Sequence, residues 1–81
     1  MERKLEIRSA VVYIDSRRNR HNALVTNVFG AACCNVLFVV DDSLKTDNYG
    51  RQTERATSVV HLSQNEARAN CWCWPDEVPT G

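Results

Sequence analysis

Four cysteines are the residues of this 81-residue chain best suited to do chemistry. Cys33 and Cys34 are adjacent, and one residue separates Cys71 from Cys73. Structural zinc sites usually leave two to four residues between paired cysteines, so neither pair has that spacing and we expect no metal. A disulfide between neighbours would be strained, whereas a link between the two pairs would close a loop of about forty residues. Free buried thiols are the default without a signal peptide, and a disulfide within or between chains is the alternative.

The two histidines could pair with a cysteine to make a nucleophile or a metal site. His21 follows a basic turn, and His61 lies within an expected strand, on the same face as Val59. We can identify no third group that would orient either ring, so we expect surface or half-buried strand residues. The chain has only three glycines, and they do not form a glycine-rich phosphate-binding loop. The adjacent Asp41 and Asp42 are typical of the start of a turn. The sequence therefore predicts no catalytic residue, no cofactor and no enzyme.

A basic cluster offers the main alternative chemistry, which is phosphate binding. Arg17, Arg18 and Arg20 stand in one polar turn, and Trp72 and Trp74 could supply stacking platforms. Ten basic residues balance ten acidic ones, and this neutral total counts against nucleic acid as the partner. The balance is uneven along the chain: residues 1–20 hold six bases against three acids, and the remainder holds four against seven. Complementary charge of this kind also suits contact between copies of the chain.

Short runs of strand-favouring residues surround these groups. We expect strands at residues 5–15, 22–29, 33–40, 57–62 and 71–74, with the second and third joined as an antiparallel hairpin. Asn19 suits the left-handed position of the turn after the first strand. Residues 41–56 read as a long polar loop, and Ser63 with Glu66 fits a capping box that starts a helical turn lasting to Asn70. The strands predict a small antiparallel barrel; an OB-like barrel or a flat sheet with one helix are alternatives.

The order of elements resembles the SH3-like small barrels. The resemblance runs through Val11-Val12-Tyr13-Ile14-Asp15, residues 22–29, residues 35–41 and Ser58-Val59-Val60-His61, and covers roughly residues 5–74. Residues 47–52 together with 58–63 also resemble small uncharacterised proteins of tailed bacteriophages. The resemblance carries no catalytic or binding signature, so it assigns no functional residues. A fold of this kind serves many functions, so the fold does not give the function either. It implies a virion structural protein that decorates a capsid or joins head to tail.

We therefore expect a non-enzymatic protein–protein interaction module, forming one domain over residues 1–75 with a flexible tail at 76–81. Its partners would be itself and other virion proteins, with no membrane and no nucleic acid, and it would be assembled in the host cytoplasm. The strand Ala10–Ile14 is apolar on both faces, which indicates cover on both sides, and tyrosine, tryptophan and arginine are typical interface anchors. The interface candidates are Val12, Ile14, Tyr49, Arg51, Arg55, Trp72 and Trp74. Alternatives are a nucleic-acid-binding barrel and a phage inhibitor of a host protein.

Overall fold

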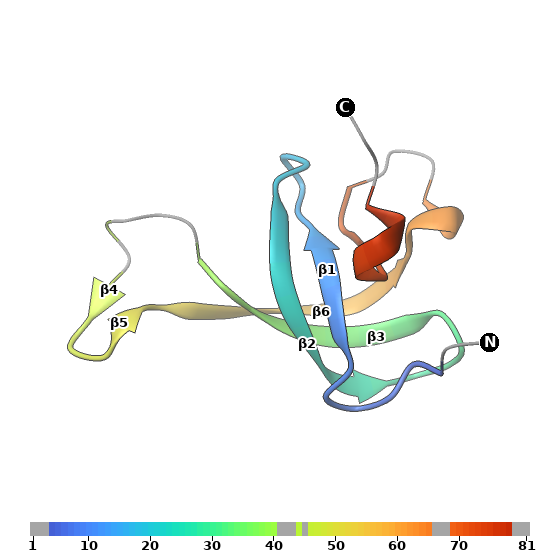
Figure 1. Ribbon diagram of the computed structural model, residues 1–81, viewed down its shortest axis with the longest axis horizontal. Coiled ribbons are helices and arrows are strands. Elements are labelled where there is room, and N and C mark those ends of the chain that lie inside the picture. The colour runs from blue at the N-terminus through green and yellow to red at the C-terminus, as the bar shows by residue number, and fades with distance from the viewer. Residues whose placement is uncertain (1–3, 41–43, 45, 66–68, 79–81) are drawn as a thin grey trace.

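The chain folds into a small, closed, five-stranded β-barrel in the computed structural model, which describes residues 4–40, 44, 46–65 and 69–78 (Figure 1). Its walls are β1 (Ala10–Ile14), β2 (Arg20–Val28), β3 (Cys33–Val39), β6 (Thr53–His61) and β7 (Cys71–Cys73), in that spatial order. The mostly β architecture and the small barrel are confirmed, and the barrel is compatible with an SH3-like one.

One pair of strands corrects the expected antiparallel barrel. Strands β1 and β2, β2 and β3, β3 and β6, and β1 and β7 pair antiparallel, but β6 and β7 run parallel, with Val60 beside Cys71 and His61 beside Trp72. A parallel neighbour needs a connection that carries the chain back to the starting end of the strand. The segment between His61 and Cys71 does this, so the barrel is mixed.

The expected helical turn is also different. The described residues contain no α-helix, only the 3₁₀ turns η1 (Leu62–Gln64) and η2 (Pro75–Glu77). The cap of η1 is His61, whose ring accepts a hydrogen bond from the Ser63 amide, and not Ser63 itself. Glu66, the other half of the expected capping box, lies outside the described residues.

The expected long loop is largely a hairpin. After residue 45 the chain forms β4 (Thr46–Asp47) and β5 (Gly50–Arg51), and β6 begins at Thr53 rather than at residue 57. Figure 1 shows this hairpin projecting from the barrel at the far end of β3 and β6. We expected a loop because these residues are polar. A strand that lies outside the core needs no apolar residues, however, and residues 53–56 form a strand by pairing with β3.

The barrel core and a smaller outer cluster cover the two faces of β1. Alternate residues of a strand point to opposite faces. Val11 and Tyr13 point into the main core, whereas Val12 and Ile14 join Cys71 and Cys73 on the outside. Leu62, the first residue of η1, and Val78 after η2 pack on that outer cluster. From Val11 to Ile14, the two-faced strand that the sequence indicates is therefore covered on both sides by its own chain, whereas Ala10 is exposed.

A bulge in β6 allows the strand to serve two parts of the barrel. The register with β3 shifts between Cys34 and Val36, and Ser58 adopts a positive φ of 52°. The Asn35 side chain accepts a hydrogen bond from the Ser58 amide at 2.9 Å, which satisfies the group that the bulge removes from the ladder. The strand can then pair with β3 along 53–56 and turn to meet β7 at residues 60 and 61.

The turn between β1 and β2 is organised by Asp15. Its carboxylate accepts hydrogen bonds from the amides of Arg17 and Asn19, at 2.8 and 2.9 Å. The left-handed residue in this turn is Arg18, with a φ of 65°, and not Asn19 as expected. Asn19 instead donates its amide to Asp15 and accepts the Asp15 amide through its carbonyl, so its backbone is held by the hairpin closure.

Candidate functional site

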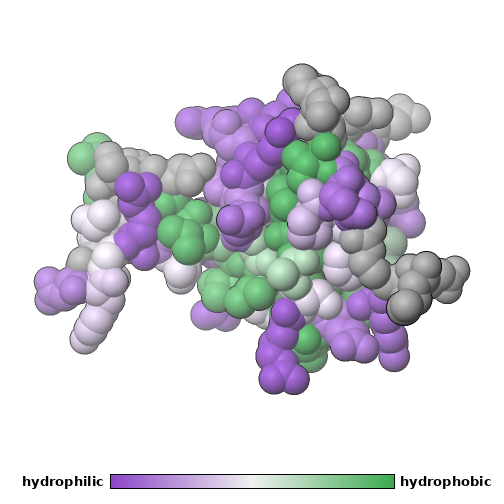
Figure 2. Space-filling view, in the orientation of Figure 1, coloured by the Kyte–Doolittle hydropathy of each residue, from purple (hydrophilic) through white to green (hydrophobic). Residues whose placement is uncertain are grey.

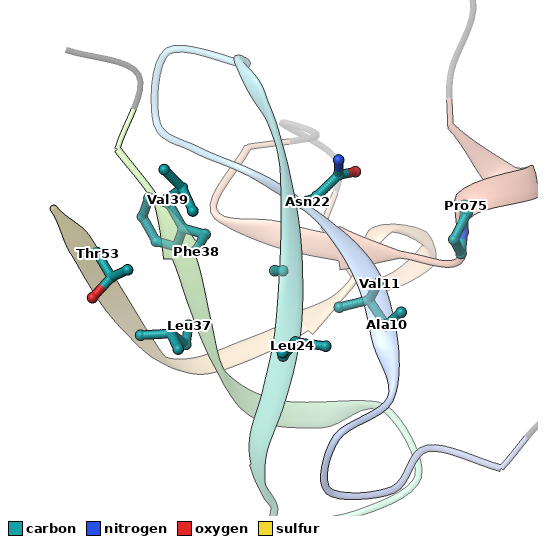
Figure 3. Close-up of a pocket in the computed structure, with 10 residues that line it drawn as sticks. Ala10, Val11, Asn22, Leu24, Leu37, Phe38, Val39, Thr53 and Pro75 are labelled. Atoms are coloured by element: carbon teal, nitrogen blue, oxygen red, sulfur yellow. The ribbon is translucent and has the colours of Figure 1, made fainter. Parts of the chain in front are cut away.

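An apolar groove crosses the outer face of the barrel wall formed by β1, β2 and β3. Figure 3 shows the residues that line it. Its volume is about 260 Å³. Register pairing aligns Ala10 with Leu24, and Leu24 with Leu37, so three neighbouring strands place apolar side chains in one row. Val39 and Thr53, which face each other across β3 and β6, continue the lining toward the projecting hairpin, and Pro75 lies at the other end.

The groove exists because two strands break the usual alternation on their solvent face. Ala23 and Val25 of β2 point into the core, so Leu24 must point outward, where a polar residue is usual. Strand β3 repeats the pattern with Leu37 and Val39. Leu24 and Val39 are about half exposed, at 49% and 51%. In Figure 2, hydrophobic residues appear over the barrel as well as on its side toward the hairpin.

Sequence reasoning missed this groove, although a signal was present. We read residues 22–29 and 33–40 as runs of strand-favouring residues without separating their two faces. Assigning alternate residues to opposite faces places Leu24 with Asn22, and Leu37 with Asn35, away from the core residues. What the alternation alone does not give is the register that aligns the two leucines.

The interface candidates fall into two groups in the structure. Val12, Ile14 and Trp72 are buried within the chain, and Trp72 is only 2% exposed. Its indole nitrogen donates to the Ala32 carbonyl at 2.9 Å, and Trp74, which is half-buried, meets its ring edge-on at 5.3 Å. These residues hold the barrel together. They would affect contact with another molecule only by positioning the residues around them.

Tyr49, Arg51 and Arg55 form the exposed group. Tyr49 lies in the turn of the β4–β5 hairpin and is 98% exposed. Arg51 in β5 donates to the Val40 carbonyl at 3.4 Å, which ties the hairpin to the end of β3. Arg55 lies opposite Leu37, so it follows the row of Ala10, Leu24 and Leu37 onto β6. The structure thus places Arg55 beside the groove and Tyr49 on the hairpin.

The four cysteines are free thiols in the structure and do not form one site. Cys34 belongs to the main core, Cys71 and Cys73 belong to the outer cluster, and Cys33 is only partly buried. Burial raises the pKa of Cys34 to about 11, with a smaller contribution from Cys33. Burial, followed by the nearby Glu77 carboxylate, raises the pKa of Cys73 to about 11, and burial also raises that of Cys71. Protonated thiols of this kind are poor nucleophiles and metal ligands.

His21 has an acidic partner that the sequence did not identify. The ring is 8% exposed, its Nε2 lies 2.8 Å from an Asp15 carboxylate oxygen, and Phe38 and Tyr13 flank it. Burial pushes the Asp15 pKa upward, but the hydrogen bonds from His21, Asn19 and Arg17 outweigh it and hold that pKa below its usual value. The pair anchors the first hairpin to the barrel wall, since Asp15 holds both the turn and the ring.

His61 is the second histidine with a carboxylate partner. Its Nε2 lies 2.9 Å from Glu77, and its Nδ1 lies 2.9 Å from the Ser63 hydroxyl oxygen. The Ser63 amide also donates to Nδ1, at 3.2 Å. Because an accepting Nδ1 has no proton, Nε2 carries the proton and donates it to Glu77. The ring thereby links η1 to η2, the two turns that cover the outer cysteine cluster.

Serine, histidine and glutamate in contact resemble the elements of a catalytic triad, but the geometry supports a structural link. A serine nucleophile needs its hydroxyl to give its proton to an available ring nitrogen. Here the nitrogen beside Ser63 already accepts from the backbone amide that caps η1. Among the described residues, no group of three or more histidine, cysteine or acidic side chains is arranged to hold a metal ion.

Comparisons with protein-family models, with curated proteins and with solved structures found no match. The resemblance to phage proteins therefore has no support from relatives. Within the described ranges, no helix has the length and apolar character needed to cross a membrane. The structure itself shows a small β-barrel with an apolar groove on its outer face.

Proposed function

We propose that the protein is a non-enzymatic protein-binding module and that the outer groove is its contact surface. The observation that supports this proposal is the outward-facing apolar row of Leu24, Leu37 and Val39, of which Leu24 and Val39 are exposed and Leu37 is half-buried. A groove of about 260 Å³ is smaller than the usual small-molecule site and suits one or two inserted side chains.

The first partner we propose is a second copy of the chain. The opposite charge of the first twenty residues and the remainder favours contact between copies. Leu44, before the hairpin, and Tyr49, in its turn, are exposed and suited to bind an apolar surface. The more specific proposal, a phage virion protein that decorates a capsid or joins head to tail, rests on the sequence resemblance alone. Its test is the presence of the protein in purified particles.

Self-association is tested with Leu24→Glu, measured by light scattering across a range of protein concentrations. Wild-type protein should form an oligomer, and the variant should be monomeric over the same range, because a charge in the groove would have to be desolvated on contact. Phe29→Ser is the matched control: Phe29 is 58% exposed but lies outside the groove, so its loss should leave the oligomer intact. A wild type that stays monomeric at high concentration would contradict the proposed partner.

Nucleic-acid binding through Arg17, Arg18 and Arg20 has less support. The three side chains lie exposed on and beside the first turn, but Trp72 is buried in the core and cannot stack on a base.

A further inference from the structure

The outer half of β6 has one strand edge with no neighbouring strand among the described residues. Residues 53–56 pair with β3 on one side, and β6 meets β7 only at Val60 and His61, beyond the bulge. Figure 1 shows this half of β6 running from the barrel to β5 beside β3. An edge of this kind presents a row of backbone groups that another strand can use.

The hydrogen-bond alternation identifies which backbone groups point to the open edge. The Val40 amide donates to the Gln52 carbonyl at 2.9 Å, so residues 40 and 52 form a hydrogen-bonded pair. Because hydrogen-bonded and non-hydrogen-bonded pairs alternate in an antiparallel ladder, Glu54 and Ala56 also bond to β3. Thr53 and Arg55 therefore direct their N–H and C=O groups away from β3, toward the open edge.

The side chains along this edge alternate in chemistry. Thr53 and Arg55 lie on the outer face, opposite Val39 and Leu37, and Thr53 lines the groove. Glu54 and Ala56 lie on the inner face, where Ala56 packs against the core. An added strand would thus meet a cation and the groove on its outer side, and an anion on its inner side.

A second copy does not suit this edge. Two-fold antiparallel pairing of β6 with itself opposes Glu54 to Glu54 or Arg55 to Arg55, depending on the register, and like charges directly opposite are unfavourable. A register centred on Ala56 avoids this, but it runs into Ser58, whose positive φ ends the regular strand. A register centred on Thr53 opposes Arg55 to Arg51, which again pairs like charges. The edge therefore favours a strand of a different sequence.

From these observations, the geometry points to residues 53–57 of β6 as a strand-addition site for an extended peptide segment. The peptide would pair antiparallel, with an acidic residue opposite Arg55, a basic residue opposite Glu54 and an apolar β-branched residue opposite Thr53, beside the groove. Backbone hydrogen bonds would supply the affinity, and these side chains the preference. This inference rests on the proposed function, since it names a class of segment that the protein-binding module would hold.

The test uses the full chain and the synthetic peptide Thr-Val-Asp-Lys-Val, whose aspartate would lie opposite Arg55. At about 1 mM peptide, which half-saturates a site of millimolar affinity, hydrogen exchange should slow at the amides of Thr53 and Arg55. The amides of Glu54 and Ala56, already bonded to β3, should change little. A peptide N-methylated at the alternate amides that would bond to β6 should give no protection of Thr53 and Arg55. Equal protection by this methylated peptide would overturn the proposal.

A second experiment tests the charge preference of the site. A peptide with lysine in place of the aspartate should bind wild-type protein about fivefold more weakly, and Arg55→Glu should reverse the preference. Thr53→Pro removes one outward amide and should abolish binding, whereas Thr53→Ala, the matched control, should retain it. Loss of the charge reversal, or binding unchanged by Thr53→Pro in a folded variant, would overturn the site.

The two proposals can fail separately. If the peptide gives no protection while Leu24→Glu still abolishes self-association, the strand-addition site is wrong and the groove proposal stands. If the peptide binds as described but the protein never self-associates, the second copy is wrong as partner of the groove and the β6 edge stands.

Discussion

The barrel is built from strands of three to nine residues and the projecting hairpin from two strands of two residues, and the two regions also differ in how their edges and faces are covered. In the barrel, β1 has a neighbour on each edge and an apolar cluster on each face. Toward the hairpin, the first half of β6 has one neighbouring strand, β3, within the described part of the chain, and its side chains are mostly exposed. The comparison teaches that an 81-residue chain can bury its own core while, among the described residues, a strand edge has no neighbouring strand and an apolar groove stays open to solvent.

The largest expected effect lies in the barrel. Trp72→Ala should lower the free energy of unfolding by about 3–5 kcal/mol, because it leaves a cavity and removes the hydrogen bond to the Ala32 carbonyl. Tyr49→Ala, in the hairpin turn, should change it by less than about 0.5 kcal/mol. Denaturant titration of both variants measures the contrast. Equal losses at the two sites would show that the hairpin belongs to the same cooperative core.

Thiol reactivity should sharpen the same contrast between covered and uncovered positions. At pH 8, one cysteine, Cys33, should react rapidly with a thiol reagent. The three buried cysteines should react on the order of a hundredfold more slowly, since they require opening of the structure. Counting modified residues over time by mass spectrometry checks this. Four equally fast thiols would contradict the burial of Cys34, Cys71 and Cys73.

The raised pKa values also predict an alkaline loss of stability. A folded-state pKa above the unfolded value stabilises the fold fully below the unfolded pKa, near 8.5, and this contribution is lost as the pH rises through the folded value. For Cys34 and Cys73 the folded value is about 11, so the loss should occur between roughly pH 8.5 and 11. Replacing both with alanine should flatten the pH dependence of the unfolding free energy in this range.

The bulge that separates the two halves of β6 should give the smallest effects. Asn35→Ala should destabilise the protein by about 1 kcal/mol, because the Ser58 amide loses its acceptor. Ser58→Gly should be neutral or stabilise by up to about 1 kcal/mol, since glycine tolerates the positive φ. Thermal unfolding of the two variants tests the assignment. Stabilisation by Asn35→Ala would mean that this hydrogen bond does not support the bulge.

The sequence predicted the barrel class from features that are local. Runs of strand-favouring residues located β2, β3 and β7 to within two residues, whereas the first predicted strand began at residue 5 and β1 begins at Ala10. The two-faced apolar run correctly indicated cover on both sides for Val11–Ile14, but Ala10 is exposed. Alternation along Cys71-Trp72-Cys73 places the tryptophan in the main core and the two thiols in the outer cluster. The start of β6 was missed, because its first residues are polar and read as loop.

The sequence by itself determined which residues could form strands and which faces could be apolar, because backbone preference and alternation are properties of neighbouring residues. Only the tertiary structure decided what covers each face. It placed η1 and Val78 over the outer cluster, paired His21 with Asp15 and His61 with Glu77, and aligned Leu24 with Leu37. Those contacts depend on strand register and on the parallel return of β7, which bring together residues that are distant in the chain.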